Sequence, residues 1–234
     1  MKSVSTFFAV LIMALLVSCS GESNDLDRNG LKGKVRATRD FTCNATYENE
    51  NWVAGVECDN GFRVVEYDTE GNYIQSYTMS DCGDTTTLST SKRENGEVVE
   101  ESYFTRINMT PIHSKLVLVS RTVMDRVSEE QVNFEVWQND QLRYEGATYY
   151  DSKGRIEKQV QVVENREVIV HHVFDKNLLV EMWQEEMDGR RSATQQYEYS
   201  DFDEHGNWTL RLVYSGEEKI TPEFAITRVL EYYE

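Results

Sequence analysis

The fold is decided by one stretch, Gln131–Tyr150, which reads QVNFEVWQNDQLRYEGATYY. In its first half Val132, Phe134 and Val136 alternate with polar residues, which is the period of two typical of a strand with one buried face. Asn139-Asp140 then supplies residue types that tolerate the positive φ angles of a tight hairpin turn. The stretch therefore predicts two antiparallel strands joined by a two-residue loop.

The same succession of strand, short polar turn and strand repeats along the chain from Val35 onward. Successive turns are often roughly 10–13 residues apart, as expected of a meander. The turns are Asn60-Gly61, Thr69-Glu70-Gly71, Asn95-Gly96, Asn139-Asp140, Ser152-Lys153-Gly154, Asn165-Arg166, Lys176-Asn177, Asp188-Gly189, Glu204-His205-Gly206 and Ser215-Gly216. We predict an all-β fold, an antiparallel meander of repeated hairpins, in a single domain covering residues 33–234. The pattern leaves open whether the sheet is extended, curved or partly closed.

The N-terminus has the regions of a secretion signal. Lys2 supplies a positive charge, and the uncharged apolar run Phe7–Val17 follows it. A run of this length is too short to span a bilayer, which needs about 20 helical residues. We therefore expect residues 1–18 to form a signal helix that is cleaved from the mature protein.

The four residues Leu16-Val17-Ser18-Cys19 resemble the lipobox of bacterial lipoproteins. The resemblance implies that the Cys19 thiol receives a diacylglyceryl group and that the chain is cut just before it. Two or more acyl chains anchor a protein stably. Residues 19–32 are mostly polar and are predicted to form a lipidated flexible tether. By the same resemblance, Ser20 directly after the cysteine favours sorting of the lipoprotein to the outer membrane. The alternative is an ordinary secretory signal in which Cys19 occurs by chance.

The chain is strongly acidic, with a formal net charge of −17 from 24 basic and 41 acidic residues. Such a surface repels phosphate backbones, so we expect no nucleic-acid partner. It also disfavours electrostatic attraction to anionic lipid headgroups. Membrane lipid is therefore expected to be reached through acylated Cys19 alone, and the charge to keep the domain solvated.

Three cysteines remain besides Cys19, in a compartment that permits disulfides. A two-residue loop at Glu50-Asn51 would place Cys43 directly opposite Cys58, at a cross-strand separation close to what a disulfide needs. A longer hairpin would instead pair Cys58 with Cys82. Three free thiols are the remaining alternative, and we favour Cys43–Cys58.

Three segments resemble the YD repeats of RHS proteins: EYDTEGNYI at Glu66–Ile74, YYDSKGRI at Tyr149–Ile156 and DFDEHGNWT at Asp201–Thr209. They share an aromatic residue, an aspartate and a glycine at similar spacing. The resemblance implies repeated β-hairpins, as in small bacterial lipoproteins that mostly lack an assigned role. Each motif is short and mainly encodes a hairpin, so the resemblance implies a fold rather than an activity.

Motifs for catalysis or metal binding are weak. Asp201–Gly206 resembles the opening of a calcium loop, but Leu212 stands where the twelfth-position glutamate belongs. His171 and His172 are neighbours in a strand and should point to opposite faces. No Gly-x-Ser-x-Gly elbow or phosphate-cradling glycine loop occurs. We therefore expect no catalytic residue, no metal and no cofactor, and a protein that is not an enzyme.

Two further features suggest modification or binding. Asp84-Thr85-Thr86 resembles an O-glycosylation motif of some exported bacterial proteins, which makes Thr85 a glycosylation candidate. The tryptophans are expected to pack across strands, or to stack on a protein or glycan partner bound to the exposed sheet. The resulting hypothesis is a non-enzymatic binding or structural module of the cell envelope. A toxin antagonist and a carboxylate or metal enzyme are the alternatives.

Overall fold

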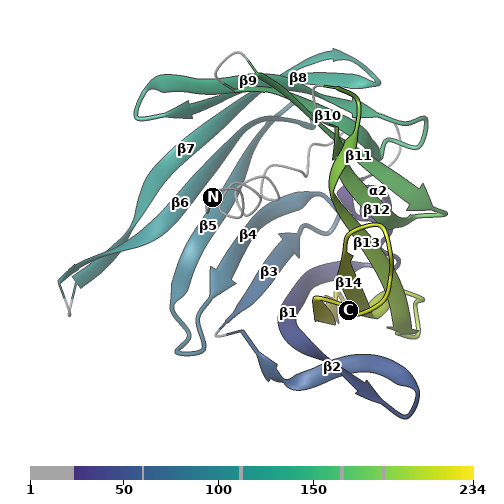
Figure 1. The fold of residues 1–234 in the computed structure, drawn as a ribbon. Coiled ribbons are helices and arrows are strands. Elements are labelled where there is room, and N and C mark those ends of the chain that lie inside the picture. Colours follow the sequence, from purple (N-terminus) through teal and green to yellow (C-terminus); the bar gives the residue numbers. More distant parts are fainter. Residues whose placement is uncertain (1–23, 60, 111–112, 164–165, 186–187) are drawn as a thin grey trace.

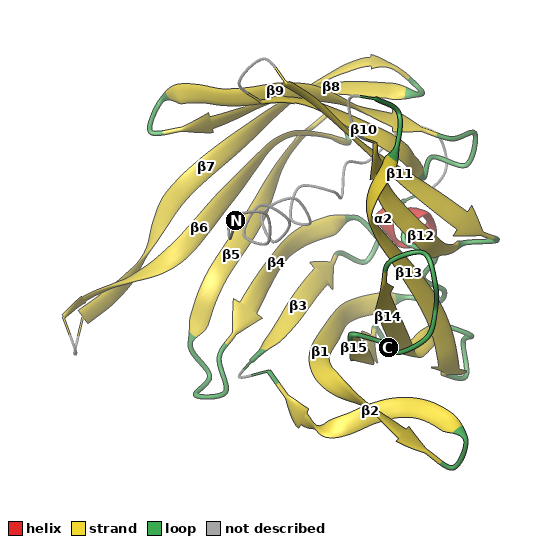
Figure 2. Ribbon diagram, viewed as in Figure 1, coloured by secondary structure: helices red, strands yellow, loops and turns green. Residues whose placement is uncertain are grey.

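A computed structural model describes residues 24–59, 61–110, 113–163, 166–185 and 188–234 (Figures 1 and 2). Its elements are the short helix α2 (Asp25–Arg28) and the strands β1 (Val35–Glu48), β2 (Asn51–Cys58), β3 (Phe62–Tyr67), β4 (Tyr73–Met79), β5 (Thr85–Glu94), β6 (Glu97–Thr110), β7 (His113–Ser128), β8 (Gln131–Gln138), β9 (Gln141–Tyr150), β10 (Ile156–Val163), β11 (Arg166–Asp175), β12 (Leu178–Glu185), β13 (Arg191–Phe202), β14 (Trp208–Ser215) and β15 (Phe224–Tyr232). The predicted signal helix, residues 1–18, lies outside the described residues.

The antiparallel meander closes on itself. From β3 to β15 each strand pairs with the next, and β15 pairs with β1 from Val35 to Cys43. Because β1 also pairs with β3, β2 stays outside the ring, and fourteen of the fifteen strands form a barrel (Figure 1). The all-β meander of hairpins is thus confirmed, and it closes fully, which goes beyond the extended, curved or partly closed sheet that the pattern left open.

The barrel interior holds most of the apolar core. On β8, Val132, Phe134 and Val136 are buried, whereas the alternate Asn133 and Glu135 are exposed. The buried three pack with Met124 and Tyr150 and further residues of the same face, and Tyr150 lines an internal cavity. The alternation that predicted the strands therefore places the apolar side chains inside the barrel and the polar side chains outside it.

The β1–β2 hairpin folds back over the outer face of the barrel. Its turn is Asn49-Glu50, with positive φ at both residues, one residue earlier than the loop predicted at Glu50-Asn51. Ala45 of β1 and Trp52 and Ala54 of β2 pack against the outward side chains of β14 and β15, namely Leu210, Leu212, Tyr214 and Ala225. The hairpin thereby covers an apolar strip that closure leaves outside the ring.

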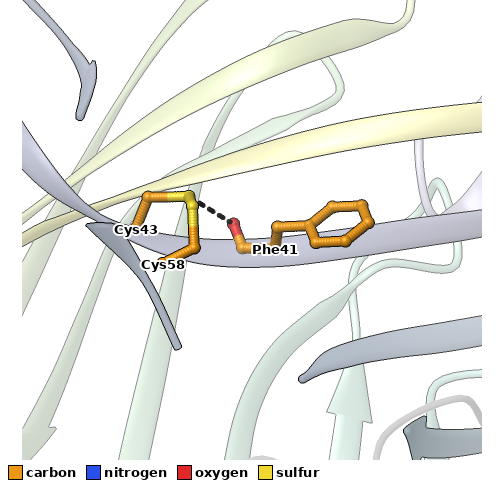
Figure 3. The surroundings of a disulfide bond; sticks show 3 residues. All are labelled: Phe41, Cys43 and Cys58. Atoms are coloured by element: carbon orange, nitrogen blue, oxygen red, sulfur yellow. Dashed lines mark hydrogen bonds between the residues drawn. A yellow bond between two sulfur atoms is a disulfide. The ribbon is translucent and has the colours of Figure 1, made fainter. Parts of the chain in front are cut away.

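A disulfide joins Cys43 to Cys58 where this hairpin leaves the barrel (Figure 3). It is the pair favoured from hairpin register, although the register is not uniform. The pairing shifts between Ala45 and Cys43, and this irregularity compensates for the earlier turn and brings the two cysteines opposite each other. Cys82 is a free, exposed thiol in the β4–β5 turn.

The resemblance to YD-repeat proteins is wrong as a statement of family, because the hairpins close into one barrel. The three segments that carried it are turns at one end of that barrel. In each, an aspartate side chain accepts two backbone N–H bonds of its own turn: Asp68 from residues 70 and 72, Asp151 from residues 153 and 155, Asp203 from residues 205 and 207. The motif is therefore a self-capped turn.

Residues 24–34, which we name the plug, close this end of the barrel. Leu26 and Leu31 are buried against Val35, Val65 and Tyr73. Backbone and side-chain hydrogen bonds tie the plug to the aspartate turns, from Leu26 N to Gly71 O at 3.1 Å and from Lys32 N to Asn207 Oδ1 at 2.7 Å. The boundary predicted between tether and domain is therefore too late, since residues 24–32 belong to the folded unit.

Helix α2 begins at Asp25, and the Asn24 side chain caps it by accepting a hydrogen bond from Asp27 N. Within the part of the chain that the structure describes, no helix is long and apolar enough to cross a membrane.

The seam between β1 and β15 carries a bidentate ion pair inside the barrel. Arg228 donates from Nε and Nη2 to the two Asp40 oxygens, both at 2.7 Å. Both side chains are largely buried, and the Arg228 guanidinium lies 3.7 Å from the centre of the Trp208 ring. The pair therefore fastens the first strand of the ring to the last.

We predict that Asp40→Asn destabilises the protein by about 3 kcal/mol, because it leaves the buried Arg228 charge without its carboxylate. Urea unfolding of the oxidised protein measures this change. Glu94→Gln, which removes the partner of exposed Lys92, serves as the control and should change stability little. Equal effects of the two substitutions would contradict a structural role for the seam pair.

Candidate ligand-binding cavity

The barrel encloses a cavity of about 670 Å³. Its lining reaches from the plug residues Asp25 and Leu31 to Asp59 and Gly61, at the opposite end of β3. Cavities of roughly 300–1,000 Å³ are typical of small-molecule sites. A fourteen-strand ring is wider than the eight-strand barrels that side chains fill unaided, which explains why both a plug and a cavity are present.

One wall of the cavity is apolar. It is built from strands β11 to β15, whose buried residues Val170, Met182, Tyr197 and Val213 form one cluster. Partly buried apolar side chains extend the cluster along the cavity, and those in the lining are Leu179, Tyr199, Phe224 and Ile226. This wall offers an uncharged surface on which the body of a ligand could lie.

Next to it, three arginines surround one carboxylate. Arg211 of β14, Arg228 of β15 and Arg63 of β3 all line the cavity, as does Asp40 of β1. We name Arg63, Arg211 and Arg228 the arginine wall. Burial alone would raise the pKa of Asp40, but the charges of Arg228, Arg211 and Arg63 outweigh it and hold this pKa below its usual value.

Within the arginine wall, Asp40 forms its ion pair with Arg228. Among the described residues, Arg63 and Arg211 form no ion pair, and Arg211 Nε is buried without a hydrogen-bond partner. The Arg211 guanidinium instead lies 5.2 Å from the Tyr197 ring centre and 5.0 Å from that of Trp208. Such cation–π contacts hold its position while leaving N–H groups for an acceptor.

A second polar group lies beneath the plug. Asp25 is 1% exposed, accepts a hydrogen bond from Tyr73 N at 2.7 Å and pairs with Arg28 and Arg93. Glu101, also buried, faces the same space from β6 and lines the cavity. Burial, together with the nearby Asp25 charge, raises the pKa of Glu101 to about 7, against the opposing charges of Arg63 and Arg93.

The two histidines of the sequence pair separate, as neighbours in a strand must. His171 faces outward and stacks on Trp183 with ring centres 4.0 Å apart. His172 lines the cavity, and its Nδ1 is buried without a hydrogen-bond partner among the described residues. Burial lowers the pKa of His172 to about 4, so its ring is neutral near pH 7.

The outer face of β7 to β9 is charged. Asp125, Glu135 and Glu145 are exposed there, with Asn133 opposite Asp125 and Glu135 opposite Glu145. Barrels that span membranes carry an apolar band on the outside and polar groups within. Here the inner face of these strands is buried and apolar, and the outer face carries these charges together with the exposed apolar residues Val123 and Val127.

Of the residues singled out from sequence, His172 and Trp208 line the cavity, and the others named here do not. Cys19 lies outside the described residues, and Thr85 lies half-buried at the start of β5, beside an exposed turn. Of the tryptophans, Trp52 packs under the β1–β2 hairpin and Trp208 faces inward. Asp203 of the calcium-like segment caps its own turn.

The arginine wall could not be found from sequence. Arg63, Arg211 and Arg228 lie in separate strands and belong to no local motif. Their one signal in the sequence is that each arginine occupies a position in a strand where the alternation of polar and apolar residues continues on either side. That signal gains meaning only once closure defines which face is enclosed.

Comparison with known proteins finds similar solved structures but no matching family. No protein-family model matches the chain, and no curated protein matches it. A porin-like protein from Bacteroides vulgatus is similar at 12% identity, over 86% of this chain and 99% of that one, with a TM-score of 0.47. A porin-like protein from Bacteroides uniformis is similar at 9% identity over the same shares, with a TM-score of 0.35.

We predict that Glu101→Gln removes a pH-dependent loss of stability. The pKa of Glu101 in the folded protein, about 7, lies above its ordinary value of 4.5. Folding therefore costs most above pH 7, where a buried charge must form, and this cost disappears as the pH falls toward 4.5. At pH 8 the variant should be more stable by roughly 1–3 kcal/mol.

Urea unfolding between pH 4.5 and 8 measures this difference. Glu100→Gln is the matched control, because Glu100 is the preceding residue of β6 and pairs in register with Lys92 on the outer face. The interpretation fails if Glu101→Gln keeps the pH dependence of the unchanged protein.

Proposed function

We propose that the protein is an exported, lipid-anchored and non-enzymatic binding protein of the outer membrane, and that it holds a small molecule inside its barrel. The observation that carries the binding role is the cavity of about 670 Å³, with an apolar wall beside buried guanidinium groups. Apolar surface with a few converging polar groups is the usual composition of a ligand site. The interior thus replaces the exposed sheet as the binding surface that we favour.

Charged residues on the outer face of β7 to β9 support anchoring by lipid rather than insertion of the barrel. Exposed Asp125, Glu135 and Glu145 would each be costly against hydrocarbon. The acyl groups implied for Cys19 would give a stable attachment without any contact between strands and lipid tails.

The plug would then determine the orientation of the barrel. From Cys19 to Asn24 the chain can reach at most about 18 Å. Acylated Cys19 would thus hold the plugged end close to the bilayer. The opposite end, where Asp59 and Gly61 line the cavity, would face away from the membrane and admit the ligand.

We predict that the mature chain binds N-phenyl-1-naphthylamine, a neutral apolar fluorophore, in a saturable manner. Fluorescence titration of the chain from residue 19 with Cys19→Ala, which avoids lipid and detergent, measures the affinity. Leu179→Trp fills part of the cavity wall and should weaken binding by at least about tenfold. Leu142→Trp, on the exposed side of β9, is the matched control. Absent binding, or equal weakening by both substitutions, would refute the cavity as the site.

We predict that Cys19→Ala releases the full-length protein from membranes in a bacterial host with lipoprotein processing. Fractionation measures the membrane-bound share, and mass spectrometry of the mature N-terminus measures acylation. Cys82→Ala, which removes an exposed thiol far along the chain, should leave both unchanged. Persistent membrane association of Cys19→Ala would mean that the anchor lies elsewhere.

A further inference from the structure

We infer that the ligand is a small organic anion, a carboxylate on an apolar body, whose acid group binds Arg63 and Arg211. This inference rests on the proposed function, because it names the ligand class of the same cavity. It follows from the charge, the free donors and the placement of the arginine wall.

Asp40 alone does not balance the charge of the arginine wall, and Glu101, the other buried acid that interacts with Arg63, has a pKa raised to about 7. Three guanidinium groups face Asp40, and one of them, Arg228, occupies both its oxygens. Burying a charge is costly unless a partner compensates it. An anion at Arg63 and Arg211 would supply the missing compensation, within a chain whose overall charge is −17.

The donors are of the kind that carboxylates prefer. A guanidinium is planar and presents parallel N–H groups, which match the two oxygens of a carboxylate. Arg211 Nε is buried and has no acceptor among the described residues. The Arg211 guanidinium lies over the Tyr197 and Trp208 rings, so the protein holds this side chain in place before a ligand binds.

We infer an apolar body for the ligand because apolar side chains lie next to the arginine wall. Ile226 stands opposite Arg211 in the β14–β15 pairing. Val213 and Tyr197 continue the same inner face away from it and are buried in one cluster with Val170 and Met182. A purely polar anion would leave this wall without contact, whereas an acyl or aromatic chain would cover it.

The test compares dodecanoate with dodecan-1-ol, which share a chain and differ in the acid group. Each is titrated against bound N-phenyl-1-naphthylamine below its aggregation concentration. We expect dodecanoate to bind at least about tenfold more tightly than the alcohol at pH 8, as a charge-assisted hydrogen bond to buried arginine would give. Equal affinities would overturn the inference while leaving the binding function intact.

Two substitutions locate the acid group. Arg63→Gln and Arg211→Gln should each weaken dodecanoate binding by about tenfold and leave dodecan-1-ol and the fluorophore unaffected. Retained fluorophore binding shows that each variant still folds. Arg121→Gln, which changes an arginine of the outer face paired with Asp140, is the matched control. If dodecanoate affinity is unchanged in both interior variants, the arginine wall is not the anion site.

Discussion

The backbone pairing of β15 with β1 is the interaction on which the rest of the structure depends. Before closure the sheet has two free edges and two equivalent faces; after it, the edges are gone and one face is enclosed. In every strand with alternating polar and apolar residues, one set of side chains then points into the barrel and the other set points out of it. The exposed Glu135 and the buried Phe134 of β8 differ in environment because strands more than 180 residues apart have met.

Closure also creates a problem that the chain solves at its N-terminus. A ring of this width cannot be filled by its own side chains, so one end receives residues 24–34. Their hold is mainly polar, through Asp25, Asn207 and the backbone of the aspartate turns. Leu26 and Leu31 are the buried apolar residues of the segment. This explains why its composition resembled a tether: two leucines among charged residues carry too weak a signal for a buried element.

The strands and the turns could be predicted from the sequence, because alternation and turn residues act locally. Asn139-Asp140 forms the two-residue turn expected of it, with positive φ at both positions. Closure is different, since it depends on the summed twist and length of all the strands. The aspartate turns illustrate the remaining error: a local capping geometry, repeated at Asp68, Asp151 and Asp203, was interpreted as a family signature.

The same closure decides which charged groups are enclosed. Acidic side chains such as Glu135 on the outer face meet water, while arginines of β3, β14 and β15 interact with Asp40 inside. The overall charge of −17 therefore says little about what the interior selects. Buried guanidinium groups with unused donors are costly to the folded state. Their cost is offset if an anion completes the site, so the seam that makes the barrel is also the place where it would recognise a ligand.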